Sequence, residues 1–123
     1  MNMLAQQKYQ QNSINTATPG ELTLMLFKGV VRFINATKKA MEQNKLEEAN
    51  ECNQRAQAII SELMITLKSE YSIANDLLPL YEYMQHQLIQ ANIKKDPLLL
   101  DEVKSYMEEL SETWSQAMKL AKK

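Results

Sequence analysis

The sequence predicts an all-α fold, an antiparallel up-down four-helix bundle with a short N-terminal segment or helix packed on it. Two observations support this class. The composition is rich in Leu, Ala, Glu, Lys, Gln and Met and holds only two Gly and three Pro, which favours helices and leaves little turn chemistry for a sheet. Apolar residues also recur at intervals of three and four along four segments with short connections, as expected of antiparallel helices. The 123 residues suffice for one domain with its own core.

The first expected helix covers residues 19–43. Thr18 and Glu21 have the spacing of a capping box, and Pro19 stands at the first helical position, where its missing N–H costs little. One apolar series has the spacing of a core-facing stripe and consists of Leu22, Leu26, Gly29, Phe33, Ala36 and Ala40. A second series lies beside it and consists of Thr23, Phe27, Val30 and Ile34. Together with Leu24 and Val31, these residues make the helix apolar over most of its circumference. Such a helix must be covered on two sides. One cover can be the core, and the other must be a further segment or a partner.

The second expected helix covers about residues 45–69. Asn44 and Glu47 repeat the spacing of a capping residue followed by an acid, so Asn44 is its expected N-cap. The first half of this helix is polar, and its carboxyl half is rich in apolar residues, among them Ile59, Ile60, Leu63, Met64, Ile65 and Leu67. This asymmetry indicates that the carboxyl half faces more than one neighbour.

The third expected helix covers about residues 77–94. Asp76 can cap it, and Pro79 then falls in the first turn, where its lost N–H does no harm. If the helix instead began near Ile73, Pro79 would lie inside it and kink it.

The last expected helix covers residues 97–121. Asp96 followed by Pro97 is a cap with proline at the first position, which is a strong start signal. Apolar residues then follow in an unbroken spacing of three and four, at Leu100, Val103, Met107, Leu110, Trp114, Ala117 and Ala121. This pattern is typical of a seam in a helix bundle.

Residues 1–17 are polar and rich in Gln and Asn, with isolated apolar residues. The pattern leaves two alternatives open. The segment is either a partly ordered tail, as termini often are, or it lies over an apolar surface through Leu4, Tyr9 and Ile14.

The composition excludes several classes of function. A net charge of −1, from 14 basic and 15 acidic residues, leaves no basic footprint for nucleic acid. Cys52 is the single cysteine, and Glu82 and His86 supply only two ligands, so the sequence indicates no disulfide, no metal site and no cofactor. Phosphate loops and nucleophile motifs are absent, so we expect no enzyme. Without a signal peptide or a run of roughly 20 apolar residues, we expect a soluble intracellular protein that does not insert into a membrane.

Two tyrosines invite a functional interpretation. Tyr81 and Tyr83 flank Glu82 and therefore point to different sides of the third expected helix, Tyr81 into the core and Tyr83 near the surface. Either they only satisfy a hydroxyl at the rim of the core, or they anchor a bound helix. The eight methionines allow the same two interpretations, as core filler or as the lining of a groove for an amphipathic helix.

An ordered series of segments resembles one known family. Residues 9–29, YQQNSINTATPGELTLMLFKG, resemble the opening of the flagellin-specific type III export chaperone family, FliS. Residues 55–63, RAQAIISEL, with Leu67, are similar to its third helix, and residues 80–84, LYEYM, to its fourth. Glu102-Val103 and the late Trp114 complete a resemblance that spans about residues 9–118.

The resemblance implies a cytoplasmic chaperone that binds the disordered C-terminal region of flagellin by helix-in-groove contacts. It would prevent premature polymerisation and support flagellar type III secretion, with other flagellar export or assembly proteins as further partners. Residues 1–17 would then be a mobile N-terminal cap segment, and residues 18–123 the bundle. By position, Tyr9 and Ile14 would belong to the cap, and the groove would be lined by Leu24, Phe27, Ile60, Leu63, Leu67, Tyr81 and Tyr83.

Two departures from the family pattern concern a missing hydroxyl and the shape of one connection. Phe27 stands where the family commonly has tyrosine, and residues 69–72 lack the Gly-Gly often seen before the fourth helix. A structural alternative also remains, in which the wide apolar faces serve only to form a homodimer and there is no secretion substrate.

Overall fold

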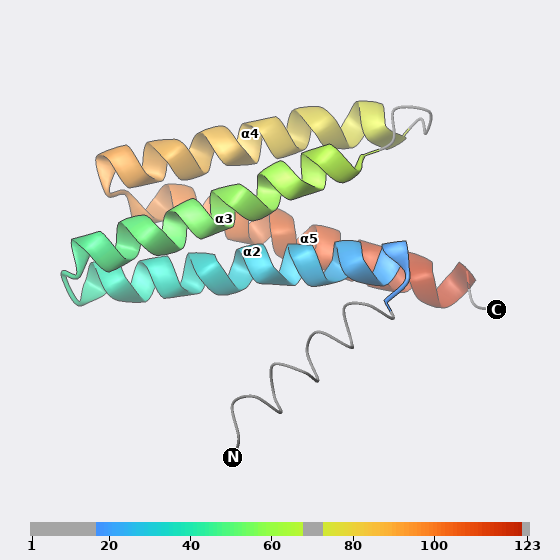
Figure 1. Cartoon of the computed structure of the whole chain (residues 1–123), viewed down its shortest axis with the longest axis horizontal. Coiled ribbons are helices and arrows are strands. Elements are labelled where there is room, and N and C mark those ends of the chain that lie inside the picture. The colour runs from blue at the N-terminus through green and yellow to red at the C-terminus, as the bar shows by residue number, and fades with distance from the viewer. Residues whose placement is uncertain (1–16, 68–72, 122–123) are drawn as a thin grey trace, which may run out of the picture.

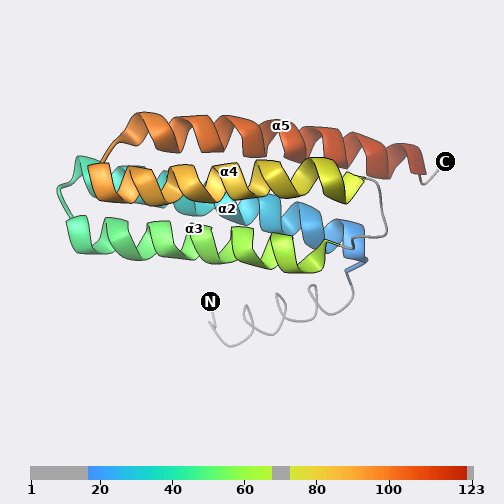
Figure 2. The same cartoon turned by 90° about the horizontal axis from the view of Figure 1, so that it is seen from above.

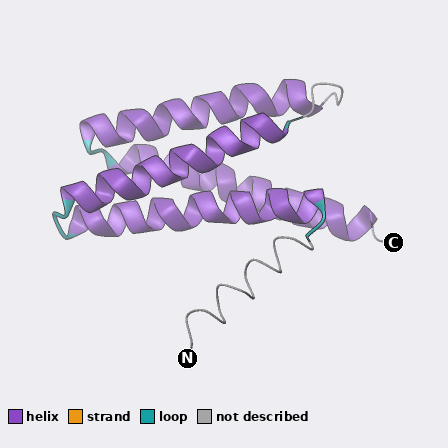
Figure 3. Cartoon of the chain, in the orientation of Figure 1, coloured by secondary structure: helices purple, strands orange, loops and turns teal. Residues whose placement is uncertain are grey.

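The computed structural model describes residues 17–67 and 73–121. Within these ranges the chain forms four long helices joined by short connections and no strands (Figures 1 and 3). The helices are α2 (Pro19–Glu42), α3 (Leu46–Thr66), α4 (Ile73–Lys94) and α5 (Pro97–Ala121). Each helix packs on its neighbour in sequence, and α5 returns to α2, which closes a four-membered ring (Figure 2). The predicted antiparallel four-helix bundle is therefore confirmed.

The interior of the ring is filled by one apolar stripe from each helix. Residues three or four apart lie on one face of a helix, which is why the stripes of α3, α4 and α5 could be read from the sequence. The stripe expected to face the core on α2 is wrong in part. Phe27, Val30 and Ile34 of the second series are fully buried, whereas Leu22, Leu26 and Phe33 of the first series are only half-buried. The buried cluster consists of Phe27, Val30, Ile34, Ala56, Ile60, Leu63, Leu77, Tyr81, Met84, Leu88, Ala91, Leu100, Val103 and Met107.

Two predicted helix starts are present as expected. The backbone N–H of Glu21 donates to the Thr18 hydroxyl oxygen at 3.1 Å, which satisfies one of the free donors of the first turn of α2. At α5 the backbone N–H of Leu98 donates to a carboxylate oxygen of Asp96 at 3.0 Å. Both caps fix where the helix begins.

The predicted role of Asn44 is wrong. Asn44 has a φ of 56°, its N–H donates to the carbonyl of Met41, and the N–H of Lys45 donates to the carbonyl of Ala40. These two bonds form the motif that closes a helix with a left-handed residue, a conformation that Asn tolerates better than most residues. Asn44 therefore ends α2, and α3 begins after Lys45 without a side-chain cap.

The preferred start of α4 at residue 77 is also wrong, and the alternative start near Ile73 is the one observed. The helix begins at Ile73, so Pro79 lies inside it and the carbonyl of Asn75 has no amide donor four residues on. Burial explains why the extra turn forms, because Ala74 and Leu77 are only 6% and 8% exposed. The end of α3 at Thr66 falls three residues before the expected end, and residues 68–72 lie outside the described ranges.

A polar network joins α3 to α4. The buried Asn53 donates from Nδ2 to the carbonyl of Leu88 at 3.0 Å and accepts a hydrogen bond from Gln57 Nε2 at 2.7 Å. Gln85 Nε2 donates to Ser61 Oγ at 2.7 Å. Because buried polar groups are costly without partners, this network favours one register of α4 on α3.

Candidate partner-binding pocket

A pocket of about 280 Å³ lies where the first turn of α2, the end of α3 and the start of α4 meet. One side chain of α5, Trp114, completes it. The lining is mainly apolar and consists of Pro19, Gly20, Thr23, Leu63, Thr66, Leu67, Ala74, Leu77, Tyr81 and Trp114.

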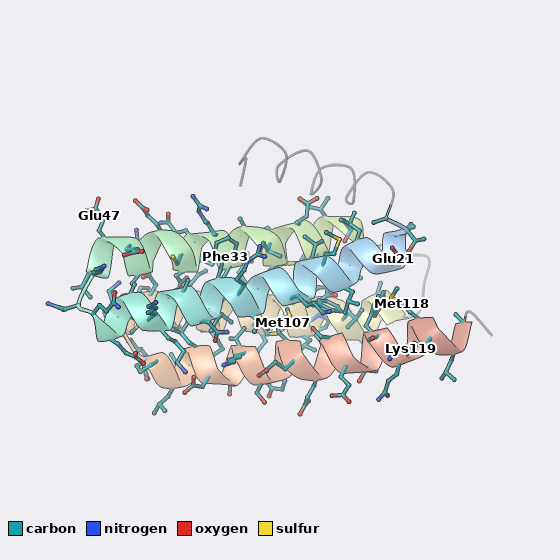
Figure 4. The ribbon with its side chains drawn as sticks, turned by 90° about the horizontal axis from the view of Figure 1, so that it is seen from below. Glu21, Phe33, Glu47, Met107, Met118 and Lys119 are labelled. Atoms are coloured by element: carbon teal, nitrogen blue, oxygen red, sulfur yellow. The ribbon has the colours of Figure 1, made fainter. Side chains whose placement is uncertain are left out.

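Trp114 fixes the wall of this pocket. Its indole Nε1 donates to the carbonyl oxygen of Gly20 at 2.9 Å, and its ring meets Phe27 edge to face with centroids 5.7 Å apart. Gly20 lies close enough to α5 that an added Cβ would stand 3.6 Å from the sulfur of Met118. Figure 4 shows Met118 near Glu21, beside the first turn of α2. The start of α2 is therefore held against α5 by a hydrogen bond and close packing.

The threonine hydroxyls of the lining are turned to internal partners. The Thr23 hydroxyl donates to the carbonyl of Pro19 at 3.1 Å, and the Thr66 hydroxyl donates to the carbonyl of Leu63 at 3.0 Å. Tyr81 is 1% exposed, and burial raises its pKa from 10.0 to about 12, so it stays neutral. The pocket thus suits an uncharged apolar side chain more than a polar or charged one.

The structure brings three of the predicted groove residues together and separates the others. Leu63, Leu67 and Tyr81 line the pocket. Phe27 and Ile60 are 0% exposed and belong to the core. Phe27 packs against Tyr81 of the pocket lining, with its ring centroid 6.4 Å from that of Tyr81.

The remaining predicted residues lie elsewhere. Leu24 is half-buried on α2 outside the lining, and Tyr83 is exposed on α4 with its hydroxyl bonded to Glu102 of α5. Tyr9 and Ile14 fall outside the described residues.

Most of the wall contributed by α2 and α5 could not be predicted from the sequence. The pattern predicts Pro19 as the first residue of a helix and Trp114 as a seam residue. It places Thr23 in an apolar series along the helix and assigns no role to Gly20. Gly20 and Trp114 are 94 residues apart, so only the closure of α5 onto α2 brings them together. The start signal at Thr18 placed the first turn of α2 correctly, but nothing in its pattern indicated that this turn forms a wall.

Other candidate sites are weaker. A wider groove of about 520 Å³ between α2 and α5 is lined mostly by polar and charged side chains, including Lys28, Glu108, Glu112 and Lys119. Within residues 17–67 and 73–121, no three His, Cys, Asp or Glu side chains are grouped so that they could hold a metal ion. Over the same residues, no helix combines the length and apolar character needed to cross a membrane.

Comparisons with known proteins agree with this architecture. The family model described as flagellar protein FliS matches residues 1–121. The flagellar secretion chaperone FliS of Bacillus subtilis (strain 168) is 44% identical over 115 residues, which cover 94% of this chain and 86% of that protein. The protein of the same name from Vibrio cholerae serotype O1 is 33% identical over 107 residues, with coverage of 85% and 79%.

The fold itself also recurs in a solved structure. A crystal structure of a flagellar chaperone from bacteria matches with a TM-score of 0.79 at 20% identity and covers 95% of this chain and 97% of its own. At that identity the match shows the same helical fold. The family match over residues 1–121 and the 44% identity show that this chain belongs to the FliS family of flagellar secretion chaperones.

Proposed function

We propose that this chain acts in the bacterial cytoplasm as the export chaperone of flagellin. It binds the disordered C-terminal region of flagellin by helix-in-groove contacts, prevents premature polymerisation and supports flagellar type III secretion. Membership of the family supports the chaperone role. The observation that carries the binding mode is the apolar pocket between the ends of α2, α3 and α4.

The pocket is suited to anchor one bulky apolar side chain of the partner. Leu63 and Leu67 line it from the end of α3 and Tyr81 from α4, and its threonine hydroxyls are already bonded internally. Full burial of a Leu or Phe side chain contributes about 1.5–3 kcal/mol. Micromolar affinity needs about 8 kcal/mol, and ordering a disordered segment consumes part of the gain. The pocket therefore serves as an anchor within a longer wrapped interface, to which Leu24 and other half-buried positions contribute.

The N-terminal segment has a proposed role in the same site. Residues 1–17 lead directly into Thr18, whose cap fixes the first turn of α2 at the edge of the pocket. We propose that this segment, through Tyr9 and Ile14, covers part of the binding surface in the free protein and leaves it when flagellin binds. Amide hydrogen exchange in residues 1–17 should then become faster when flagellin is added.

Leu67 and Ile65 provide a matched test of the pocket. Both are on the last turn of α3 or directly after it, but Leu67 lines the pocket, whereas Ile65 is 77% exposed and does not. Leu67→Asn should weaken binding of the flagellin C-terminal segment by about tenfold or more, since it places a polar group in an apolar pocket. Ile65→Asn should leave the affinity within a factor of about three.

The comparison of Leu67→Asn with Ile65→Asn decides whether the pocket anchors flagellin. Equal affinities for Leu67→Asn and Ile65→Asn, measured by calorimetry, would show that the pocket is not the anchor.

Light scattering tests the alternative that the protein is only a homodimer. If the apolar faces served only homodimerisation, the measured mass would remain that of a dimer after flagellin is added, whereas the proposed chaperone forms a complex with flagellin.

A further inference from the structure

A second surface on α4 and α5 has the properties of a docking site. Tyr83 and Tyr106 are 42% and 37% exposed, and their rings meet edge to face with centroids 6.3 Å apart. Leu98, which is 72% exposed, precedes Glu102 and Tyr106 at steps of four on α5. We call the surface formed by Tyr83, Leu98, Glu102 and Tyr106 the tyrosine face. Figure 2 shows α4 and α5 running side by side.

The tyrosine face is separate from the pocket. Tyr81 lines the pocket, and Tyr83, two residues later, lies roughly 200° further round the helix. Tyr83 contacts α5 through Glu102 and Tyr106. A partner can therefore use one surface without occupying the other.

Glu102 orders the tyrosine pair before any partner binds. One of its carboxylate oxygens accepts hydrogen bonds from the Tyr83 hydroxyl at 2.7 Å and from Gln87 Nε2 at 2.9 Å. The hydrogen bond to Glu102 also raises the pKa of Tyr83, so its hydroxyl remains a donor near neutral pH. Because the ring of Tyr83 is already held, less side-chain entropy is lost on binding, and tyrosine is among the residues most enriched at binding hot spots.

The charges around the tyrosine face determine which partner it suits. Glu102 and Glu109 lie four residues before and three residues after Tyr106, so all three share one face of α5. On α4, His86 lies three residues after Tyr83, and the nearest lysine or arginine is Lys94, about 16 Å along the helix from Tyr83. Aromatic rings attract cations, and a carboxylate that accepts two hydrogen bonds retains further acceptor capacity. The face therefore complements arginine or lysine.

We propose that the tyrosine face is a second docking site, distinct from the pocket, for an amphipathic helix of a partner protein that carries arginine or lysine among apolar residues. The partner's cation lies against the tyrosine rings and Glu102. Its apolar side chains pack on Leu98 and on the exposed parts of the two rings. This pairing of cation and aromatic surface distinguishes the tyrosine face from the uncharged pocket.

Selection from a phage-displayed library of helical peptides tests this proposal. The full-length protein is the target, and its Tyr106→Ser variant is used for counterselection, which removes peptides that bind the pocket. Enriched sequences should carry Arg or Lys with apolar residues three or four positions away. A synthetic peptide of the leading sequence should bind about tenfold more weakly to Tyr106→Ser and to Glu102→Gln. It should bind with unchanged affinity to Tyr106→Phe, which keeps the ring, and to Leu67→Asn.

Four results would overturn the proposal. Enrichment of acidic or uncharged sequences would contradict the charge complementarity, and no enrichment over the counterselected variant would show that the face binds no such helix. A dimer in light scattering that becomes a monomer in Tyr106→Ser would identify a second copy of the chain as the occupant. An equal loss of flagellin affinity in Tyr106→Ser and Leu67→Asn would assign the face to the flagellin interface. Circular dichroism of both variants verifies that each remains folded.

Discussion

The indole Nε1 of Trp114 donates a hydrogen bond to the carbonyl oxygen of Gly20 at 2.9 Å, which joins α5 to the first turn of α2 across 94 residues of sequence. This contact lies in the wall of the apolar pocket. It determines the position of the turn that follows the N-terminal segment, and therefore the shape of the site to which we assign flagellin.

Two substitutions of Trp114 separate the contribution of its hydrogen bond to stability from the contribution of its packing. Trp114→Phe should destabilise the protein by about 1 kcal/mol, because it removes the donor but keeps an aromatic ring against Phe27. Trp114→Ala should cost more, about 2–4 kcal/mol, since it also removes the ring. Urea unfolding followed by circular dichroism measures both values. Equal stabilities of Trp114→Phe and the wild type would show that the tether contributes nothing.

The cap of α2 can be tested in the same assay. Thr18→Ala should lower the free energy of unfolding by about 1 kcal/mol, because the N–H of Glu21 loses its acceptor. Thr18→Ser keeps the hydroxyl and should retain most of the stability. If Thr18→Ala and Thr18→Ser lowered the free energy of unfolding equally, the methyl group of Thr18 rather than its hydroxyl would be responsible.

Most of the fold could be predicted from the sequence because it depends on local signals. Thr18 and Asp96 cap the helices that they were expected to cap, and the periodic apolar residues of α3, α4 and α5 supply their shares of the core. Asn44 misled the prediction because one residue type serves both helix starts and left-handed helix ends. Pro79 misled it because burial of Ala74 and Leu77 outweighs the local cost of proline.

Less of the pocket could be predicted, for a geometric reason. Of the residues predicted for a groove, Leu63, Leu67 and Tyr81 line this pocket, whereas Phe27 and Ile60 lie in the core. On a helix that is apolar over most of its circumference, periodicity does not tell which side faces the core and which faces the pocket. Trp114 and Gly20 come together only through the closure of the bundle, which leaves no local pattern in either segment.

Phe27 should therefore behave as a core residue. Phe27→Ala should destabilise the protein by about 3–5 kcal/mol, since the ring is 0% exposed and packs against Tyr81 and Trp114. Leu24→Ala, at a half-buried position on the same helix, should cost clearly less. Thermal unfolding of the two variants provides the comparison. A small loss of stability for Phe27→Ala together with a large loss of flagellin affinity would show that Phe27 belongs to the binding surface and not to the core.

Ionisation of Tyr81 should lower the stability of the protein at alkaline pH. Its pKa is 10.0 when unperturbed and about 12 in the folded protein, because burial disfavours the phenolate. The folded state therefore resists ionisation, so the contribution of Tyr81 is fully present below pH 10 and is lost as the pH rises towards 12. The loss amounts to about 2–3 kcal/mol over that interval.

The variant Tyr81→Phe isolates this contribution from other alkaline titrations. The decline in the free energy of unfolding between about pH 10 and 12 should be shallower in Tyr81→Phe than in the wild type. Parallel curves for the two proteins would show that Tyr81 does not ionise less readily in the folded state.

Titration calorimetry of this chain with the C-terminal segment of flagellin from the same bacterium is the decisive test of flagellin as its partner. We expect binding at micromolar concentrations or tighter, with a heat-capacity change that is clearly negative because apolar surface is buried. The same titration with Leu67→Asn should show weaker binding. Absence of binding to the wild type at roughly 100 µM would contradict the assignment of flagellin as the partner of this bundle.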